Sequence, residues 1–172
     1  MAKGVNMDWR EEIQKFIVRR DTGDGGRSFV DVKGMMGRPE LLYDVIGEIG
    51  DLILRNHPSI KAVGSHGVGG SFLIGPAILY VYAHWYNING FFVRLDSREN
   101  SDHQPIEGRL ERGWRVVIVD DIIETGGACM KACNILRAHG CEVDGIIVVV
   151  DLSRGENECC HSGLKVESLL TL

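Results

Sequence analysis

The stretch VVIVDDIIETGGA, residues 116–128, decides how this chain folds. Four apolar residues come first, then Asp120 and Asp121, then two apolar residues and a turn that contains glycine. An unbroken apolar run of this kind predicts a strand buried on both faces, as in a parallel sheet covered by helices. Residues 127–139 have apolar side chains at helical spacing, and Gly140 is a good stop signal. The stretch therefore predicts a buried strand, an acidic strand end, a turn and a helix.

The rest of the chain repeats this alternation of strands and helices. Helices are expected over residues 8–19, 39–55, 72–84 and 127–139, and strands over residues 29–32, 61–63, 91–93, 116–119 and 146–150. We therefore predict an α/β fold with a central, mostly parallel sheet flanked by helices on both faces. Ligands of such sheets bind at the carboxyl ends of the strands, where loops 64–71, 94–108 and 120–128 follow. Residues 95–113 show no periodicity, so we predict a long binding loop or lid there.

Composition excludes several classes of protein. The chain has 172 residues, which suits one domain with one sizeable core. Its 44% hydrophobic and 25% charged residues exclude disordered and fibrous classes. The net charge of −5 argues against a protein that coats nucleic acid. The longest apolar stretch, residues 72–83, is too short to span a bilayer, and the first residues contain no apolar signal core. We therefore expect a cytoplasmic protein with small-molecule partners and no nucleic-acid or membrane partner.

The cysteines indicate reduced thiols rather than a disulfide framework. Five are present, and no two form a Cys-x-x-Cys pair: Cys129, Cys133, Cys141, Cys159 and Cys160. The run Cys159-Cys160-His161 is a candidate metal cluster. Adjacent cysteines chelate one zinc ion poorly, so surface or half-buried thiols are the preferred interpretation.

The acidic strand end and the turn after it predict a binding site. Asp120 and Asp121 need partners if they are buried, and sugar hydroxyls or a hydrated Mg²⁺ would serve. Residues 124–128 then open a helix, whose free amide groups and positive dipole end suit a phosphate. The Thr125 hydroxyl adds a donor. Together these groups predict a ribose-phosphate site; the alternative is a plain strand end with an aspartate helix cap.

This stretch resembles the thirteen-residue phosphoribosyl pyrophosphate (PRPP) signature of type I phosphoribosyltransferases. The resemblance implies that Asp120 and Asp121 hold the ribose hydroxyls and, through PRPP, an Mg²⁺ cofactor, and that residues 124–128 bind the 5′-phosphate. The implied PRPP-binding residues are Asp120, Asp121, Ile122, Ile123, Glu124, Thr125, Gly126, Gly127 and Ala128, with Arg94 and Arg98. It further implies one domain, with a small hood from the N-terminal segment (about residues 1–38) and the C-terminal end (about 151–172) around a core (about 39–150). A homodimer is also implied.

A second glycine-rich loop is a candidate anion site. It consists of Gly64, Ser65, His66, Gly67, Val68, Gly69 and Gly70. Gly70 stands where a P-loop has its lysine, and Phe72 stands where a dinucleotide fingerprint has its third glycine, so neither nucleotide motif is present. Backbone amides alone can still cradle an anion. On the glycine pattern alone a flexible turn is equally acceptable, whereas the family resemblance implies a pyrophosphate loop.

The loop after residue 93 carries cations that could close over a leaving pyrophosphate. Spacing alone favours a solvated loop of mixed charge. The segment is similar to the catalytic loop of orotate phosphoribosyltransferases, where Arg94 matches the arginine and Arg98 replaces a lysine. Leu95 and Asn100 depart from that pattern at a lysine and a histidine, and His103 lies three residues after Asn100. The resemblance implies catalytic roles for Arg98 and His103.

Two features bear on the base that such an enzyme would use. Segments that resemble the orotate subfamily place Phe29, Lys33 and Arg154 as base-binding residues. Glu124 instead stands where phosphoribosyltransferases for 6-oxopurines usually have an aspartate, and a carboxylate there would suit a general base. The alternative for Glu124 is an outward-facing side chain that favours the helix dipole.

The expected function is therefore transfer of ribose 5-phosphate from PRPP to a base, with release of pyrophosphate. Orotate is the best single candidate and a 6-oxopurine the second. The expected catalytic residues are Asp120, Asp121, Arg98, His103 and Glu124. A non-catalytic sensor of PRPP or a nucleotide is a rival hypothesis, as is another transferase or a phosphohydrolase on the same scaffold. Tyr80, Tyr82, Trp85 and Tyr86 are expected to pack in a core or a subunit interface.

Overall fold

The computed structural model describes residues 8–19, 28–30, 34–35, 37–95 and 104–172. The chain separates into two compact units, residues 1–45 and 46–172. The boundaries near residues 38 and 150 that the sequence suggests stay predictions. Among the described residues, no helix has the length and apolar character needed to cross a membrane.

The first unit contains a short helix and a two-stranded ribbon. Helix α1 (Trp9–Gln14) begins after Asp8, whose carboxylate accepts a hydrogen bond from the Arg10 amide at 3.0 Å. Strands β1 (Ile17–Arg19) and β2 (Ser28–Val30) pair in antiparallel fashion. The helix expected over residues 8–19 is therefore wrong in its second half, because that segment forms a ladder with β2. Helix α3 (Pro39–Asn56) begins in this unit, continues into the second and confirms the helix expected over residues 39–55.

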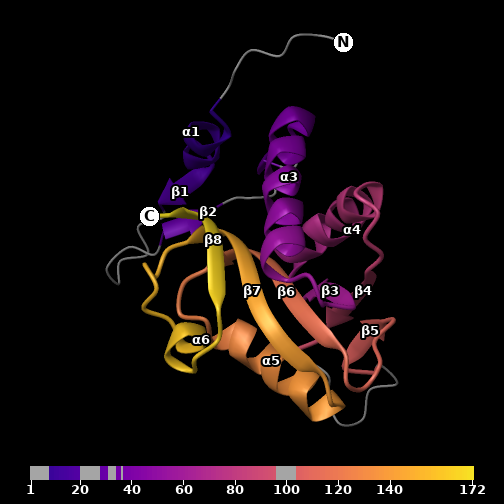
Figure 1. The fold of residues 1–172 in the computed structure, drawn as a ribbon. Helices are drawn as coiled ribbons and strands as arrows, with labels where there is room; N and C mark the ends of the chain where they lie inside the picture. Colours follow the sequence, from indigo (N-terminus) through magenta and orange to yellow (C-terminus); the bar gives the residue numbers. More distant parts are fainter. Residues whose placement is uncertain (1–7, 20–27, 31–33, 36, 96–103) are drawn as a thin grey trace. The chain divides into compact units, whose positions relative to one another are not determined.

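The second unit is built on one six-stranded sheet (Figure 1). Its strands are β3 (Ala62–Ser65), β4 (Asn89–Val93), β5 (Ile106–Gly108), β6 (Arg115–Ile123), β7 (Glu142–Asp151) and β8 (Val166–Thr171). They lie in the order β5-β4-β3-β6-β7-β8, and every neighbouring pair is parallel except β4 with β5. The predicted mostly parallel sheet is confirmed. The register places the carboxyl ends of β3 and β6 side by side.

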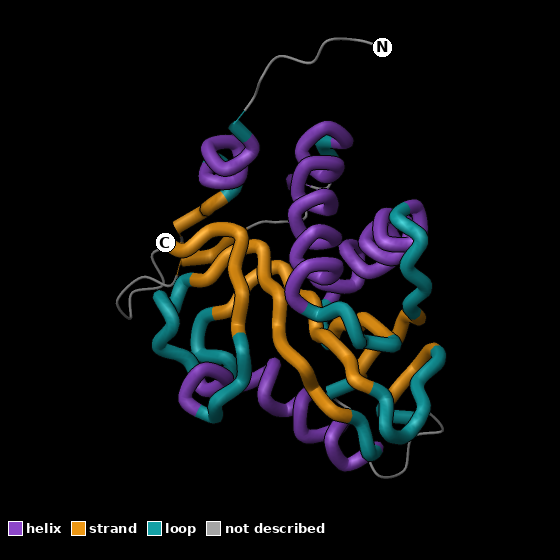
Figure 2. The backbone as a smooth tube through the Cα atoms, viewed as in Figure 1, coloured by secondary structure: helices purple, strands orange, loops and turns teal. Residues whose placement is uncertain are grey.

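Helices cover both faces of this sheet. Helix α4 (Val68–Ala83) packs on one face, against β3, β4 and β6. Helices α5 (Gly127–His139) and α6 (Glu158–His161) lie on the other face, as the purple segments in Figure 2 show. The interior of β6 from Val116 to Val119 has no exposed surface. Helix α5 turns Cys129, Cys133 and Leu136 toward the core, as its apolar spacing predicts.

Two boundaries differ from the sequence-based expectation. The helix expected over residues 72–84 begins four residues earlier, at Val68, and holds Pro76 within it. Segment 95–113, expected to be a structureless loop, contains β5, which pairs with β4 at the edge of the sheet. A three-residue edge strand has too few residues to show an alternating pattern.

A buried ion network ties the amino ends of the strands to the end of α3. The His57 side chain is only 1% exposed; its Nδ1 lies 2.6 Å from an Asp144 oxygen and its Nε2 lies 2.7 Å from a Glu167 oxygen. Arg115 also pairs with Asp144, and Lys165 lies 3.1 Å from Glu167. Burial alone would raise the pKa of both carboxyls. Hydrogen bonds to these partners outweigh that effect and hold the pKa of Asp144 and of Glu167 below the ordinary values.

Replacement of His57 should destabilise the fold and reduce its acid sensitivity. We expect His57→Gln to lower the free energy of unfolding by about 2 to 4 kcal/mol, because two carboxylates lose their shared partner. Carboxyls with lowered folded-state pKa values stabilise the protein fully above their ordinary values of about 4, and that contribution is lost as the pH falls through the folded-state values. Urea unfolding of wild type and variant between pH 7 and pH 3 measures both effects. The exposed His139→Gln is the control, and equal midpoints for wild type and His57→Gln would contradict this account.

Candidate active site

The carboxyl ends of β3 and β6 bring the two glycine-rich segments of the sequence together. Gly64 on β3 pairs in register with Ile118 on β6, so loop 64–70 lies beside the acidic end of β6. A Cβ atom on Gly69 would overlap the Asp121 carboxylate. A Cβ atom on Gly70 would lie 2.5 Å from the Val119 carbonyl oxygen. Glycine is therefore required at both positions for α4 to begin so close to β6.

The two aspartates are adjacent on β6, and their side chains share a hydrogen bond. Asp120 is 5% exposed, and its Oδ1 lies close to Gly70 at the start of α4. Its Oδ2 lies 3.0 Å from His66 Nε2, and its Oδ1 accepts a hydrogen bond from the Asp121 amide at 3.0 Å. Asp121 faces the start of α4, against Gly69. Both predicted ribose-binding carboxylates thus lie at one strand end, in different surroundings.

Asp121 carries a proton more readily than an ordinary aspartate. Burial, repulsion by the Asp120 carboxylate and a hydrogen bond with Asp120 raise the pKa of Asp121 to about 7. At neutral pH this group is poised between acid and anion. A ligand that donates hydroxyl hydrogens, or a nearby cation, would favour the anion.

The turn after β6 is braced by the segment that leads into α6. Gly126 has φ +81 and directly precedes α5, so a left-handed residue opens the helix. The Glu158 amide donates to the Thr125 carbonyl at 3.0 Å, and the Cys159 thiol donates to the Gly126 carbonyl at 3.5 Å. The first amides of α5 stay available to an anion at this turn. Glu124 and Thr125 are both exposed there, as a site open to a ligand requires.

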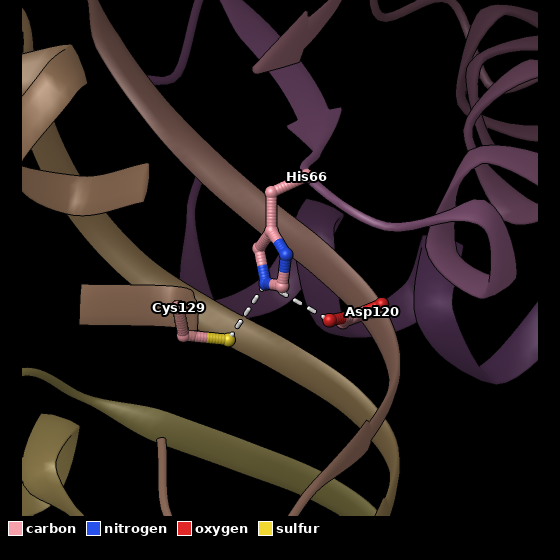
Figure 3. A group of neighbouring side chains, drawn as sticks. All are labelled: His66, Asp120 and Cys129. Atoms are coloured by element: carbon pink, nitrogen blue, oxygen red, sulfur yellow. Dashed lines mark hydrogen bonds and ion pairs between the residues drawn. The ribbon is translucent and has the colours of Figure 1, made fainter. Parts of the chain in front are cut away.

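A contact that the sequence analysis missed joins loop 64–70 to α5. His66 Nε2 lies 3.1 Å from Cys129 Sγ as well as beside Asp120 (Figure 3). Cys129 directly follows the predicted motif and lies on the apolar face of α5, which is the only signal in the sequence. The suggested cluster Cys159-Cys160-His161 does not converge: Cys159 is buried, whereas His161 is exposed and lies 3.2 Å from Glu156.

The remaining predicted site residues have mixed outcomes. Arg94 follows the carboxyl end of β4, and its guanidinium pairs with Glu107 of β5. Arg154 has φ +55 and donates from Nε to the carbonyl oxygen of Leu172 at 3.1 Å. Lys33, Arg98 and His103 lie outside the described residues, as does the side chain of Phe29. Their roles stay predictions.

Comparison with known proteins identifies relatives of this chain. The model of the phosphoribosyl transferase domain matches residues 73–165. The orotate phosphoribosyltransferase of Aquifex aeolicus is 30% identical over 158 residues, which cover 91% of this chain and 85% of that protein. The enzyme of the same name from Rhodopirellula baltica is 30% identical over 112 residues, 64% of this chain and 58% of the relative. That from Bacillus subtilis is 29% identical over 121 residues, 70% of this chain and 54% of the relative. The chain thus spans little more than half the length of these last two relatives.

Solved structures share the fold. Orotate phosphoribosyltransferase of Mycobacterium tuberculosis in complex with PRPP superposes with a TM-score of 0.70 at 23% identity, covering 96% of this chain and 87% of that chain. Adenine phosphoribosyltransferase of Thermoanaerobacter pseudethanolicus superposes with a TM-score of 0.70 at 18% identity, covering 94% of this chain and 99% of that chain. At these identities the likeness concerns the fold alone.

The glycine requirement at the start of α4 can be tested with two alanine variants of one helix. We expect Gly69→Ala to lower the free energy of unfolding by about 1 to 3 kcal/mol, because the added methyl group displaces the Asp121 carboxylate. Gly75→Ala is the matched control, because a Cβ atom there has no neighbour within 4 Å. The control should gain about 0.5 to 1 kcal/mol from helix propensity. Urea unfolding measures both, and a stabilised Gly69→Ala would refute the close approach.

Proposed function

This chain belongs to the phosphoribosyltransferase family, and from that premise we propose that it transfers ribose 5-phosphate from PRPP to orotate. In this reaction the C1′–oxygen bond to pyrophosphate breaks, pyrophosphate keeps the electron pair, and the base nitrogen forms the new bond to C1′. The proton of that nitrogen passes to solvent. One observation carries the proposal: a pair of aspartates lies between loop 64–70 and the start of α5. The names of the relatives support orotate as the base.

Each element of the site has a distinct task in this proposal. Asp120 and Asp121 accept hydrogen bonds from the ribose hydroxyls and balance the positive charge that develops on the ribose as the C1′–oxygen bond breaks. The amides at residues 124–128 bind the 5′-phosphate at the start of α5. Loop 64–70 binds pyrophosphate through its backbone. Hydroxyl donors at Asp121 would lower the pKa that burial and Asp120 raise, so ligand binding favours the anion that the site needs.

We propose that PRPP binds together with Mg²⁺. The oxygens of Asp120 and Asp121 are hard donors of the kind that Mg²⁺ prefers, directly or through sugar hydroxyls and water. A cation nearby would also favour the Asp121 anion, which its surroundings disfavour. When bound, Mg²⁺ supplies charge neutralisation for the pyrophosphate leaving group.

Glu124 supports a second candidate substrate. Its side chain is exposed at the first residue of the proposed phosphate-binding segment 124–128. A carboxylate there fits a 6-oxopurine, on whose ring it would act as a proton acceptor. A sensor of PRPP that performs no transfer is the alternative outside catalysis.

A cytoplasmic location, expected from the sequence, also stays a prediction.

The test of the transferase proposal is pyrophosphate release from PRPP and Mg²⁺ with a panel of bases. We expect release with orotate, and a loss of about 10²- to 10³-fold in kcat/KM for Asp120→Asn and for Asp121→Asn, because each removes a charge that stabilises the transition state. Glu142→Gln, an exposed change at the amino end of β7, is the control and should keep full activity.

The other outcomes of this panel are equally informative. Release with hypoxanthine, guanine or xanthine instead of orotate would overturn the choice of base and make Glu124→Gln the next variant. No release with any base, together with PRPP binding measured by calorimetry, would contradict the transferase proposal and support the sensor.

We also propose that the protein forms a homodimer through the outer face of α4. This helix is apolar on all sides, a pattern typical of a helix that is covered all round. Exposed apolar residues nevertheless recur along it at intervals of three, four or seven: Val68, Phe72, Leu79 and Tyr82. Trp85, just beyond the helix, is 98% exposed. A second copy of the same stripe would cover this face.

Charge introduced into the stripe should separate the dimer. We expect Leu79→Glu to convert a dimer into a monomer in sedimentation equilibrium, because a carboxylate cannot be buried there without a partner. Asn134→Glu, on the exposed side of α5, should leave the mass unchanged. A wild-type protein that sediments as a monomer would refute the proposal.

A further inference from the structure

Three electron-pair donors from three separate elements converge between loop 64–70 and α5. They are His66 Nε2, Asp120 Oδ2 and Cys129 Sγ, and all lie within 4.8 Å of one another. The imidazole nitrogen is the central atom, 3.0 Å from the carboxylate oxygen and 3.1 Å from the sulfur (Figure 3). Among the described residues, this is the one group of at least three histidine, cysteine or acidic side chains so arranged.

The imidazole nitrogen has two neighbours but only one position for a hydrogen bond. His66 Nε2 has either one proton to donate or one lone pair to offer, and it lies at contact distance from both Asp120 and Cys129. When the nitrogen donates to Asp120, the Cys129 thiol donates to Cys159, and the sulfur keeps its lone pairs. A cation at the centre would be bound by all three atoms together.

The donor set and its spacing fit zinc-like ions. Imidazole nitrogen, thiolate sulfur and carboxylate oxygen are the three ligand types of Zn²⁺ in proteins. Bond lengths of about 2.0 to 2.3 Å in a tetrahedron place ligand atoms about 3.3 to 3.6 Å apart. The observed separations of 3.0 and 3.1 Å therefore need to widen by only a few tenths of an ångström.

The three side chains are held in place before any ion arrives. Asp120 accepts a hydrogen bond from the Asp121 amide, and its Oδ1 lies so close to Gly70 that a Cβ atom there would be 2.8 Å away. The Cys129 residue is 3% exposed within the core between α5 and the sheet. The side chain of His66 is 7% exposed. Preorganisation of this kind lowers the entropy lost on binding.

We propose that His66, Asp120 and Cys129 form a binding site for a thiophilic divalent cation of the Zn²⁺ type. Cys159 of α6, which hydrogen-bonds to the Cys129 thiol, is the nearest further donor for a fourth position. Binding exchanges the thiol proton for the metal: the sulfur–hydrogen bond breaks, the sulfur–metal bond forms, and the proton passes to the buffer. Affinity should therefore rise with pH.

The consequence for the reaction is competition, and this part rests on the proposed function. The cation occupies the Asp120 oxygen that faces His66, and it links loop 64–70 to α5. Asp120 is the residue proposed to hold a ribose hydroxyl, and loop 64–70 is proposed to hold pyrophosphate. Zinc-like ions should thus act as inhibitors that exclude the sugar phosphate, in contrast to the Mg²⁺ that accompanies PRPP.

Cobalt provides a direct test, because Co²⁺ replaces zinc and reports a thiolate ligand through an intense near-ultraviolet charge-transfer band. Metal-free wild-type protein, kept reduced, is titrated with Co²⁺ and then with Zn²⁺. We expect the band to appear with about one equivalent of Co²⁺ and to disappear when Zn²⁺ displaces it.

Variants assign the ligands. Cys129→Ser should abolish the band, or lower the affinity for Zn²⁺ by at least about tenfold if Cys159 takes its place. His66→Asn should keep some sulfur ligation but also lose at least about tenfold in affinity. Cys160→Ser, which changes a half-buried thiol outside the three donors, is the control and should match the wild type. Circular dichroism of each variant establishes that it is folded.

Ribose 5-phosphate separates this proposal from the proposed function, because it lacks the pyrophosphate group that would itself chelate metal. We expect ribose 5-phosphate to weaken Co²⁺ binding to the wild type. Absence of a cobalt band, or a band that Cys129→Ser leaves intact, would overturn the metal site whatever the transferase assay shows. A cobalt band unaffected by saturating ribose 5-phosphate would overturn the competition.

Discussion

The close approach of α4 to the end of β6 is the constraint on which the site depends. A strand with two acidic residues near its carboxyl end places their carboxylates against whatever element lies beside it. Here that element begins with glycines, and the space a side chain would fill is taken by the Asp121 carboxylate and by the Val119 carbonyl. The start of α4 therefore packs directly against the carboxyl-terminal part of β6. Without the glycines the two candidate anion sites would be pushed apart, and Asp121 would lose the helix start that packs against it.

This close packing brings two carboxylates together, and a bound ligand would offset the repulsion between them. Two carboxylates at adjacent positions of a buried strand repel each other, and burial adds to that effect at Asp121, whose pKa rises to about 7. Asp120 instead contacts His66 and a backbone amide. The site is thus prepared for a partner rich in hydroxyl donors or accompanied by a cation. A sugar phosphate with Mg²⁺ has both properties, which is why the fold's geometry and the proposed chemistry agree.

Much of this architecture follows from local sequence. The run at residues 116–119 predicts a buried strand because a short run that is apolar on both faces is typical of the interior of a covered parallel sheet, and the helix at 127–139 follows from its spacing and from Gly140. Local sequence places the start of α4 too late because Gly69 and Gly70 have low helix propensity. Glycine is required at these positions by the neighbouring strand β6, and local sequence does not reveal that contact. Strand β5 escapes prediction because its pairing with β4 is a long-range event. The contact between His66 and Cys129 joins residues 63 positions apart, and no pattern in either segment indicates the other.

The histidine in loop 64–70 gives Asp120 two possible partners. The Oδ2 atom of Asp120 lies 3.0 Å from the imidazole of His66, and both side chains are buried inside the protein. A sugar bound at this strand end would need a lone pair of that same carboxylate. Asp120 has two oxygens; Oδ1 accepts from the Asp121 amide and Oδ2 contacts His66, so a ribose hydroxyl would share one of these oxygens with a partner already present. Asp121 also has hydrogen bonds with the backbone at Asp121 and Ile122, but burial and the Asp120 carboxylate outweigh them and raise its pKa to about 7. The two acids of the motif are therefore unequal: Asp120 contacts His66 of loop 64–70, whereas Asp121 is the group whose raised pKa lets its charge respond to what binds.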